Sequence, residues 1–146
     1  MKRIIYLICG LIAAGIVMAI SIDNIGNENG RKSMNPEEVA EAFCRAVATG
    51  DFAQARDFCD TASMSEYLKI CSRNWSFLVQ NDSTVASVAK GMMDKINFRI
   101  DGNTRDGGIR YIDYTISTEE GLNKSKTMSL KKEEGEWRVT SVTDRR

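Results

Sequence analysis

Histidine is absent from all 146 residues of the sequence. Histidine is the commonest general acid–base near neutral pH and the commonest protein ligand of transition metals. Its absence argues against most hydrolytic and metal-dependent active sites. We therefore expect no catalytic residues, no bound metal and no cofactor in this chain.

The sequence also lacks an excess of charge of either sign, because it has 20 basic and 20 acidic residues. Proteins that bind nucleic acid gather lysine and arginine on one face. Here the basic residues between 124 and 146 are interleaved with glutamates between 119 and 136. This mixture predicts a solvated surface and no nucleic-acid partner.

Proline occurs once, and its position is informative. Asn35, Pro36 and Glu38 occupy the cap, the first and the third positions of a typical helix start. Apolar residues then recur at helical spacing until Gly50, which is expected to end the helix. Asp51 is a second cap and predicts a second helix that begins at Phe52.

Two more helices are expected before the sequence pattern changes. Apolar residues at helical spacing predict a third helical region within 63–80. The stretch from Thr84 to Met93 predicts a short fourth helix, weakened by Gly91.

From Asp94 onward apolar and polar residues alternate, which is typical of half-buried strands. Four such pieces are separated by turn-forming pairs, of which Asp101-Gly102 is the first. The apolar sets expected on one face are Ile96, Phe98, Ile100, Ile112, Tyr114, Ile116, Met128, Leu130, Trp137 and Val139. Helices followed by an antiparallel meander predict an α+β domain, with N-terminal helices packed on a curved four-stranded sheet.

One hydrophobic segment precedes this domain. Lys2 and Arg3 are followed by an uncharged run from Ile4 to Ile22, the pattern of an export signal that is also just long enough to span a bilayer. We expect residues 1–22 to be a signal peptide or a transmembrane anchor, and both alternatives stay open. Residues 23–34 are predicted to form a flexible linker and residues 35–146 the domain. We expect the domain to lie outside the cytoplasmic membrane, either in the periplasm or anchored to the membrane.

Several short motifs carry a family resemblance. The runs 35–39, 42–43 and 50–55, together with Gly135-Glu136-Trp137-Arg138-Val139, resemble the helix starts and final strand of NTF2-like (cystatin-like cone) domains. The likeness is greatest to DUF4878-type domains of exported bacterial proteins. The resemblance implies a curved sheet around a long helix, often with a pocket between them and often in a homodimer. It implies no functional residue.

Three cysteines lie in the expected domain: Cys44, Cys59 and Cys71. A disulfide is chemically permitted outside the cytoplasm, and three cysteines allow only one at a time. Cys59 and Cys71 are the preferred pair, because both fall on inner faces of consecutive helices. A set of unpaired, buried cysteines is the alternative.

Four further side chains are candidates for function. Tyr67, Trp75 and Tyr114 are candidates for lining a pocket, although aromatic residues at such spacings are typical of a core. We expect a non-enzymatic, exported, envelope-associated domain that binds a small apolar ligand or a protein partner. One alternative is a small isomerase- or hydratase-like enzyme that uses Asp113 and a tyrosine, and another is a structural dimerisation module.

Overall fold

The computed structural model describes residues 33–93 and 95–145. Within these ranges the elements are α2 (Pro36–Ala48), α3 (Phe52–Asp57), α4 (Thr61–Asn81), α5 (Val85–Met93), β1 (Asn97–Asp106), β2 (Ile109–Ser117), β3 (Asn123–Glu133) and β4 (Glu136–Asp144). The strands form one sheet in the order β1-β2-β3-β4, and all neighbours are antiparallel. This confirms the α+β fold class.

The N-terminal predictions fall mostly outside the described residues. The segment 1–22 and the linker up to residue 32 are not described. The last two linker residues are described and contact the domain. The Ser33 hydroxyl lies 3.4 Å from the Gly135 carbonyl oxygen, and Met34 packs against the core. No helix in the described ranges combines the length and the apolar character needed to cross a membrane.

The helix starts follow the predicted capping pattern. Asn35 Oδ1 accepts a hydrogen bond from the Glu38 backbone N–H at 2.9 Å, and the Glu38 carboxylate accepts one from the Asn35 N–H. Asp51 caps α3 by accepting from the Gln54 N–H at 3.1 Å. Helix α4 is longer than the predicted 63–80, because Asp60 caps it at Thr61.

One predicted turn is a bulge instead. Strand β1 does not end at Asp101-Gly102 but continues to Asp106, with a shift in register between Ile100 and Gly102. A Cβ atom at Gly102 would lie 3.3 Å from Oδ2 of Asp113 on the neighbouring strand. The glycine therefore allows a close approach within the sheet, which is a common role of glycine in strands.

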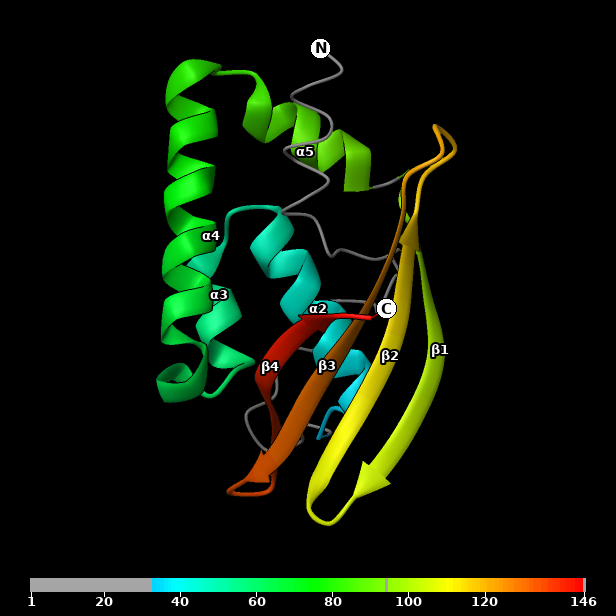
Figure 1. The fold of residues 1–146 in the computed structure, drawn as a ribbon. Coiled ribbons are helices and arrows are strands. Elements are labelled where there is room, and N and C mark those ends of the chain that lie inside the picture. The colour runs from blue at the N-terminus through cyan, green and yellow to red at the C-terminus, as the bar shows by residue number, and fades with distance from the viewer. Residues whose placement is uncertain (1–32, 94, 146) are drawn as a thin grey trace.

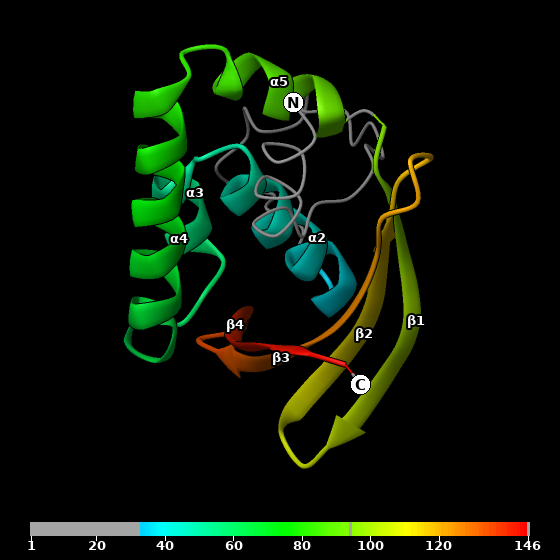
Figure 2. The ribbon, with the colours of Figure 1, turned by 45° about the horizontal axis from the view of Figure 1, so that its top comes forward.

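The four described helices lie on one side of the sheet, which curves around α2 (Figures 1 and 2). Helix α2 contacts β2 and β4, while α4 contacts β4 and α5 extends from the far end of α4. We call the helix-covered side the inner face and the opposite side the outer face. The inner face carries the predicted apolar set, and its centre is completely buried: Ile112, Tyr114, Ile116, Met128, Leu130 and Val139 are each 0% exposed.

The connection between α3 and α4 pairs with the edge of the sheet. The Asp60 N–H donates to the Val139 carbonyl at 2.8 Å, and the Val139 N–H donates to the Phe58 carbonyl at 2.9 Å. Cys59 therefore forms a short parallel bridge with β4. The bridge covers part of an edge that would otherwise be open to strand pairing.

Candidate functional site

Two of the three predicted pocket residues lie together in the core. Tyr67 of α4 packs against Phe43, with ring centroids 6.2 Å apart, and Tyr114 of β2 stacks on Phe98 at 5.0 Å. Burial raises the pKa of both tyrosines well above its ordinary value of 10, and the neighbouring Cys44 thiol adds to the shift at each. Both hydroxyls are therefore neutral at physiological pH.

The third candidate, Trp75, lies elsewhere. A Cβ atom at Gly50 would come within 2.3 Å of the Trp75 indole, and Gly50 has a φ of +75°. Trp75 therefore packs tightly against the turn between α2 and α3, where only glycine fits. The structure does not bring it together with Tyr67 and Tyr114.

Two hollows among the described residues also avoid these tyrosines. One is an open, polar groove of about 560 Å³ between the α3–α4 connection and the β3–β4 hairpin, lined by Arg56, Cys59, Asp60, Thr61, Glu133, Glu134 and Arg138. The other holds only about 50 Å³ beside Met92 and the β2–β3 hairpin. In the described part of the chain, the aromatic candidates belong to packed core rather than to the wall of either hollow.

The disulfide expected between Cys59 and Cys71 is not formed. All three described cysteines are free and buried. Cys59 precedes the cap of α4, and Cys71 lies about three turns after the first residue of that helix, Thr61, which is a rise of roughly 15 Å at 1.5 Å per residue. A disulfide needs Cα atoms within about 7 Å. Burial raises the pKa of the Cys44 thiol to about 12, so this cysteine is not a nucleophile at neutral pH.

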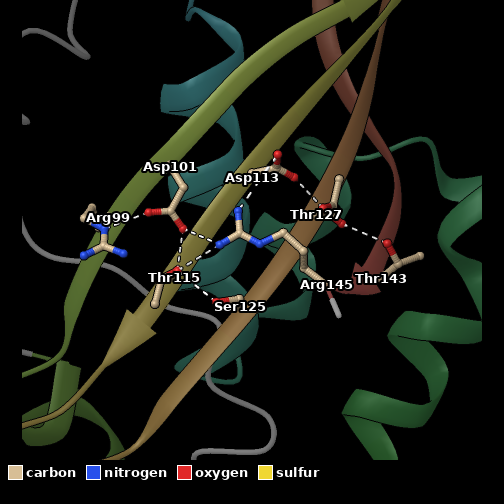
Figure 3. Close-up of polar contacts among 8 residues, drawn as sticks. All are labelled: Arg99, Asp101, Asp113, Thr115, Ser125, Thr127, Thr143 and Arg145. Carbon is tan, nitrogen blue, oxygen red and sulfur yellow. Dashed lines mark hydrogen bonds and ion pairs between the residues drawn. The ribbon is translucent and has the colours of Figure 1, made fainter.

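Many polar side chains on the outer face of the sheet are joined by hydrogen bonds (Figure 3). Short hydroxyl side chains from β2, β3 and β4 meet there in rows across the strands. Thr115 pairs with Ser125 at 3.0 Å, and Ser129 pairs with Thr140 at 2.8 Å. The outer-face network, as we call it, comprises Arg99, Asp101, Asp113, Thr115, Ser125, Thr127, Ser129, Thr140, Ser141, Thr143 and Arg145.

Arg145 extends across this face from the end of β4. Its Nη2 lies 2.7 Å from Asp101 Oδ2 at the β1 bulge, and its Nη1 lies 3.9 Å from Asp113 Oδ2 (Figure 3). Arg99 holds the other Asp101 oxygen at 2.7 Å. The hydrogen bond from the Thr115 hydroxyl, then Arg99 and Arg145, lower the pKa of Asp101 to about 2.

Asp113 points to the outer face, as its position next to inner-facing Ile112 predicts. It accepts a hydrogen bond from the Thr127 hydroxyl. Tyr67 and Tyr114 lie on the inner side, so the sheet separates them from Asp113. Tyr111 shares the outer face, two residues away, and no hydrogen bond joins it to Asp113 among the described contacts. Asp101, with its low pKa, is a poor general base near neutral pH.

Sequence reasoning did not single out the outer-face network. One signal was present: Ser125, Thr127 and Ser129 alternate with the inner-facing residues of β3. The role of Arg145 could not be found this way, because its partner Asp101 is 44 residues away in the chain. Among the described residues, no three Cys, Asp or Glu side chains converge as metal ligands do.

Comparison with known proteins supports the fold. No protein-family model matches the sequence, and no curated protein sequence matches it. Among solved structures, a candidate NTF2-like transpeptidase from Campylobacter jejuni is similar over 73% of this chain and 97% of its own, with 20% identity and a TM-score of 0.51.

Two weaker similarities have TM-scores below 0.5. One is an NTF2-like protein of unknown function from Cytophaga hutchinsonii, with 12% identity, coverage of 77% of this chain and 90% of that protein, and a TM-score of 0.36. The other is a SEC-C motif containing protein from Rhodopseudomonas palustris, with 14% identity, coverage of 76% and 79%, and a TM-score of 0.41. The finer likeness to DUF4878-type domains stays an expectation. The described part of the chain has an NTF2-like fold.

Proposed function

We propose that this chain is a non-enzymatic binding domain at the cell envelope and that the outer face of its sheet binds a second copy of the chain. The observation that carries the proposal is the outer-face network, an ordered surface of hydroxyl groups with its charges paired internally. The expected N-terminal signal or anchor supplies the location of the domain outside the cytoplasmic membrane.

A hydroxyl-rich surface suits contact with a copy of itself. Each serine or threonine hydroxyl both donates and accepts hydrogen bonds, so the same group can face its own symmetry mate. An isologous interface requires this self-complementarity. The charged residues of the network have partners within it, since Asp101 bonds to Arg99 and Arg145, and Asp113 lies 3.9 Å from Arg145. Burial of the network at an interface would therefore leave none of its own charges without a counter-ion.

The size of the face agrees with a moderate, reversible contact. Four strands at their usual spacing are roughly 19 Å wide, and ten residues of strand are roughly 33 Å long. The face thus offers roughly 600 Å² to a partner, somewhat less than the roughly 800 Å² per partner of a typical stable interface. We expect a weak homodimer rather than an obligate one.

The alternatives have less support. A small apolar ligand would need room near the inner face, where Tyr114, Ile112 and Met128 are already fully buried among protein atoms. An enzyme based on Asp113 would need a tyrosine positioned to share its proton transfer. Tyr67 and Tyr114 lie on the other side of the sheet, and Tyr111, which shares the outer face, forms no hydrogen bond with Asp113 among the described contacts.

Sedimentation velocity of the full chain in mild detergent tests the proposal. The parent should sediment as a concentration-dependent dimer. Thr127→Arg places a long side chain in the middle of the outer face, beside Asp113, and should give a monomer that keeps its circular dichroism spectrum. Ser65→Arg on the exposed surface of α4 is the matched control and should remain dimeric. A monomeric parent, or a dimer unaffected by Thr127→Arg, would overturn the proposal.

The location is tested separately. A reporter that is active only outside the cytoplasm, fused after Arg146, should be active in cells that express the full chain. An inactive reporter with normal protein levels would contradict export.

A further inference from the structure

The open, polar groove beside the β3–β4 hairpin has no role in the proposed function. Its volume of about 560 Å³ falls within the roughly 300–1,000 Å³ that is usual for small-molecule sites. The connection from α3 to α4 forms one wall and the tip of the hairpin forms the other, at the lower left of Figure 1. The groove is therefore large enough for a small ligand, and its lining side chains indicate which kind.

Three of the lining residues are held by contacts within the protein. Cys59 is 2% exposed. Arg138 donates to the Asp57 carbonyl oxygen at 2.5 Å and to the Glu136 carboxylate at 3.0 Å. Asp60 accepts hydrogen bonds as the cap of α4. The polar groups of this part of the groove are therefore already engaged.

Three other lining residues carry charges without a counter-charge. Arg56 lies on α3, whereas Glu133 and Glu134 lie at the tip of the hairpin. None of the three forms an ion pair within the described part of the chain. Unpaired charges of opposite sign therefore line the two walls of one groove.

The backbone places Glu134 in an unusual conformation. Glu134 and Gly135 have φ angles of 50° and 84°, as expected for a type I′ turn that joins two strands by two residues. Asparagine, aspartate and glycine are preferred in such turns, and Glu134 is the only residue other than glycine with a positive φ in the described ranges. Because strained backbone clusters at functional sites, a role for this carboxylate in the groove would explain why a glutamate occupies the turn.

We propose that the groove binds an amino acid, a small molecule with one carboxylate and one or two ammonium groups, and that a basic amino acid such as lysine fits it best. The planar guanidinium of Arg56 holds the carboxylate, for which it presents paired N–H donors. Glu133 and Glu134 accept hydrogen bonds from the ammonium groups, each of which has three donors. Lysine carries one negative and two positive charges, so each unpaired charge of the groove gains a counter-charge.

Other small ligands leave part of the groove unmatched. A simple anion such as phosphate would lie beside the two glutamates, and an apolar molecule would remove water from charged groups without replacing its hydrogen bonds. Among the residues that the structure describes, no three Cys, Asp or Glu side chains converge as metal ligands do. Because the groove is open to solvent, we expect a weak dissociation constant for lysine, on the order of 1 mM.

The groove and the centre of the outer face are separate. Thr127 precedes Glu133 by six residues on β3, a separation of roughly 20 Å along the strand. Thr127→Arg should therefore be monomeric and still bind lysine. Self-association and lysine binding can thus fail independently.

Amide chemical shifts of the isotope-labelled full chain in mild detergent, titrated with L-lysine, test the inference. We expect saturating shifts at amides that line the groove, such as those of Thr61 and Glu134. Arg56→Gln should weaken binding at least about fivefold, and so should Glu133→Gln combined with Glu134→Gln, because each removes hydrogen bonds to a charged group.

Two exposed residues away from the groove supply matched controls. Arg73→Gln on α4 and Glu120→Gln beside the β2–β3 hairpin make the same chemical changes and should bind lysine as the parent does. All of these variants alter exposed polar side chains and should keep the circular dichroism spectrum of the parent.

Ligands that lack one of the charged groups test the assignment of each wall. The diamine 1,5-diaminopentane, which has no carboxylate, should bind at least about fivefold more weakly than lysine and should be unaffected by Arg56→Gln. Hexanoate, which has no ammonium group, should not bind. A short peptide that ends in lysine distinguishes the source of the ligand, because binding tighter than that of free lysine would assign the groove to the C-terminus of a peptide.

Two results would overturn the inference. One is a titration that does not saturate by about 20 mM lysine, well above the expected dissociation constant. The other is equal binding by the parent, by Arg56→Gln and by the double glutamine variant, which would show that the shifts come from general effects of ions.

Discussion

Ile112 and Asp113 are consecutive residues of β2 and lie on opposite faces of the sheet. Ile112 is 0% exposed beneath the helices, whereas the Asp113 side chain is about one-third exposed on the outer face. The first is held by apolar burial and the second by polar contacts with Thr127 and Arg145. Two mechanisms of stabilisation therefore alternate along a single strand.

This difference predicts that the two faces respond differently to substitutions, pH and salt. Apolar burial depends on contact area and packing and is nearly independent of pH. The outer-face network depends on ionised groups near solvent, which titrate and are screened by salt. Substitutions on the inner face should therefore dominate stability, while conditions of pH and salt should act through the outer face.

The largest effect is expected for Ile112→Ala. The substitution removes apolar contacts and leaves a cavity beneath α2, which costs about 2–5 kcal/mol of unfolding free energy. Urea denaturation followed by circular dichroism measures the loss.

Asp113→Ala is the matched control on the adjacent residue. It should cost less than about 1 kcal/mol, because the side chain is partly solvated and its ion pair with Arg145 is long. Equal losses for the two variants would show that the faces do not differ as described.

A smaller effect, dependent on pH, is expected for Asp101→Asn. The pKa of Asp101 is about 2 in the folded chain against an ordinary value of 3.8. Because the folded state lowers this pKa, the ionised carboxylate stabilises the fold above pH 4, and this contribution is lost as the pH falls toward 2. The loss in Asp101→Asn should be about 1 kcal/mol at pH 7, after allowance for screening by solvent.

The pH profile distinguishes this contribution from a loss of packing. Parent and Asp101→Asn should converge in stability as the pH approaches 2, and Arg145→Ala should lose only part of the same pH dependence, because Thr115 and Arg99 also lower the pKa of Asp101. A constant difference between parent and Asp101→Asn from pH 7 to pH 2 would count against the ion pair as its cause.

Much of the fold could be predicted from local sequence patterns. The capping box at Asn35 and the alternation around Ile112 each depend on residues within one turn or one strand. The bulge was missed because Asp101-Gly102 has turn chemistry, and only the close approach of Asp113 from the neighbouring strand explains its glycine. Local patterns identify elements, but cross-strand contacts decide where some of them end.

The site was harder to predict than the fold for the same reason. The aromatic candidates Tyr67, Trp75 and Tyr114 were selected by residue type, and the structure packs them against Phe43, Gly50 and Phe98. Apart from the Arg99–Asp101 pair, the outer-face network joins residues that are 10 to 44 positions apart and have no unusual composition. Its order comes from strand register, which fixes which hydroxyl faces which carboxylate.

The smallest effect is expected for Tyr114→Phe, which tests the inner face at a fully buried hydroxyl. The Tyr114 hydroxyl makes no hydrogen bond to nitrogen or oxygen in the described structure, and its polar neighbour is the Cys44 thiol, a weak partner. A buried polar group without a good partner destabilises the fold, so its removal should leave stability unchanged or raise it by up to about 1 kcal/mol. Tyr114→Ala, which also removes the ring stacked on Phe98, should instead cost about 3–5 kcal/mol. A clear loss in Tyr114→Phe would show that the contact with Cys44 is a strong hydrogen bond, and that the inner face, like the outer one, depends on a polar interaction.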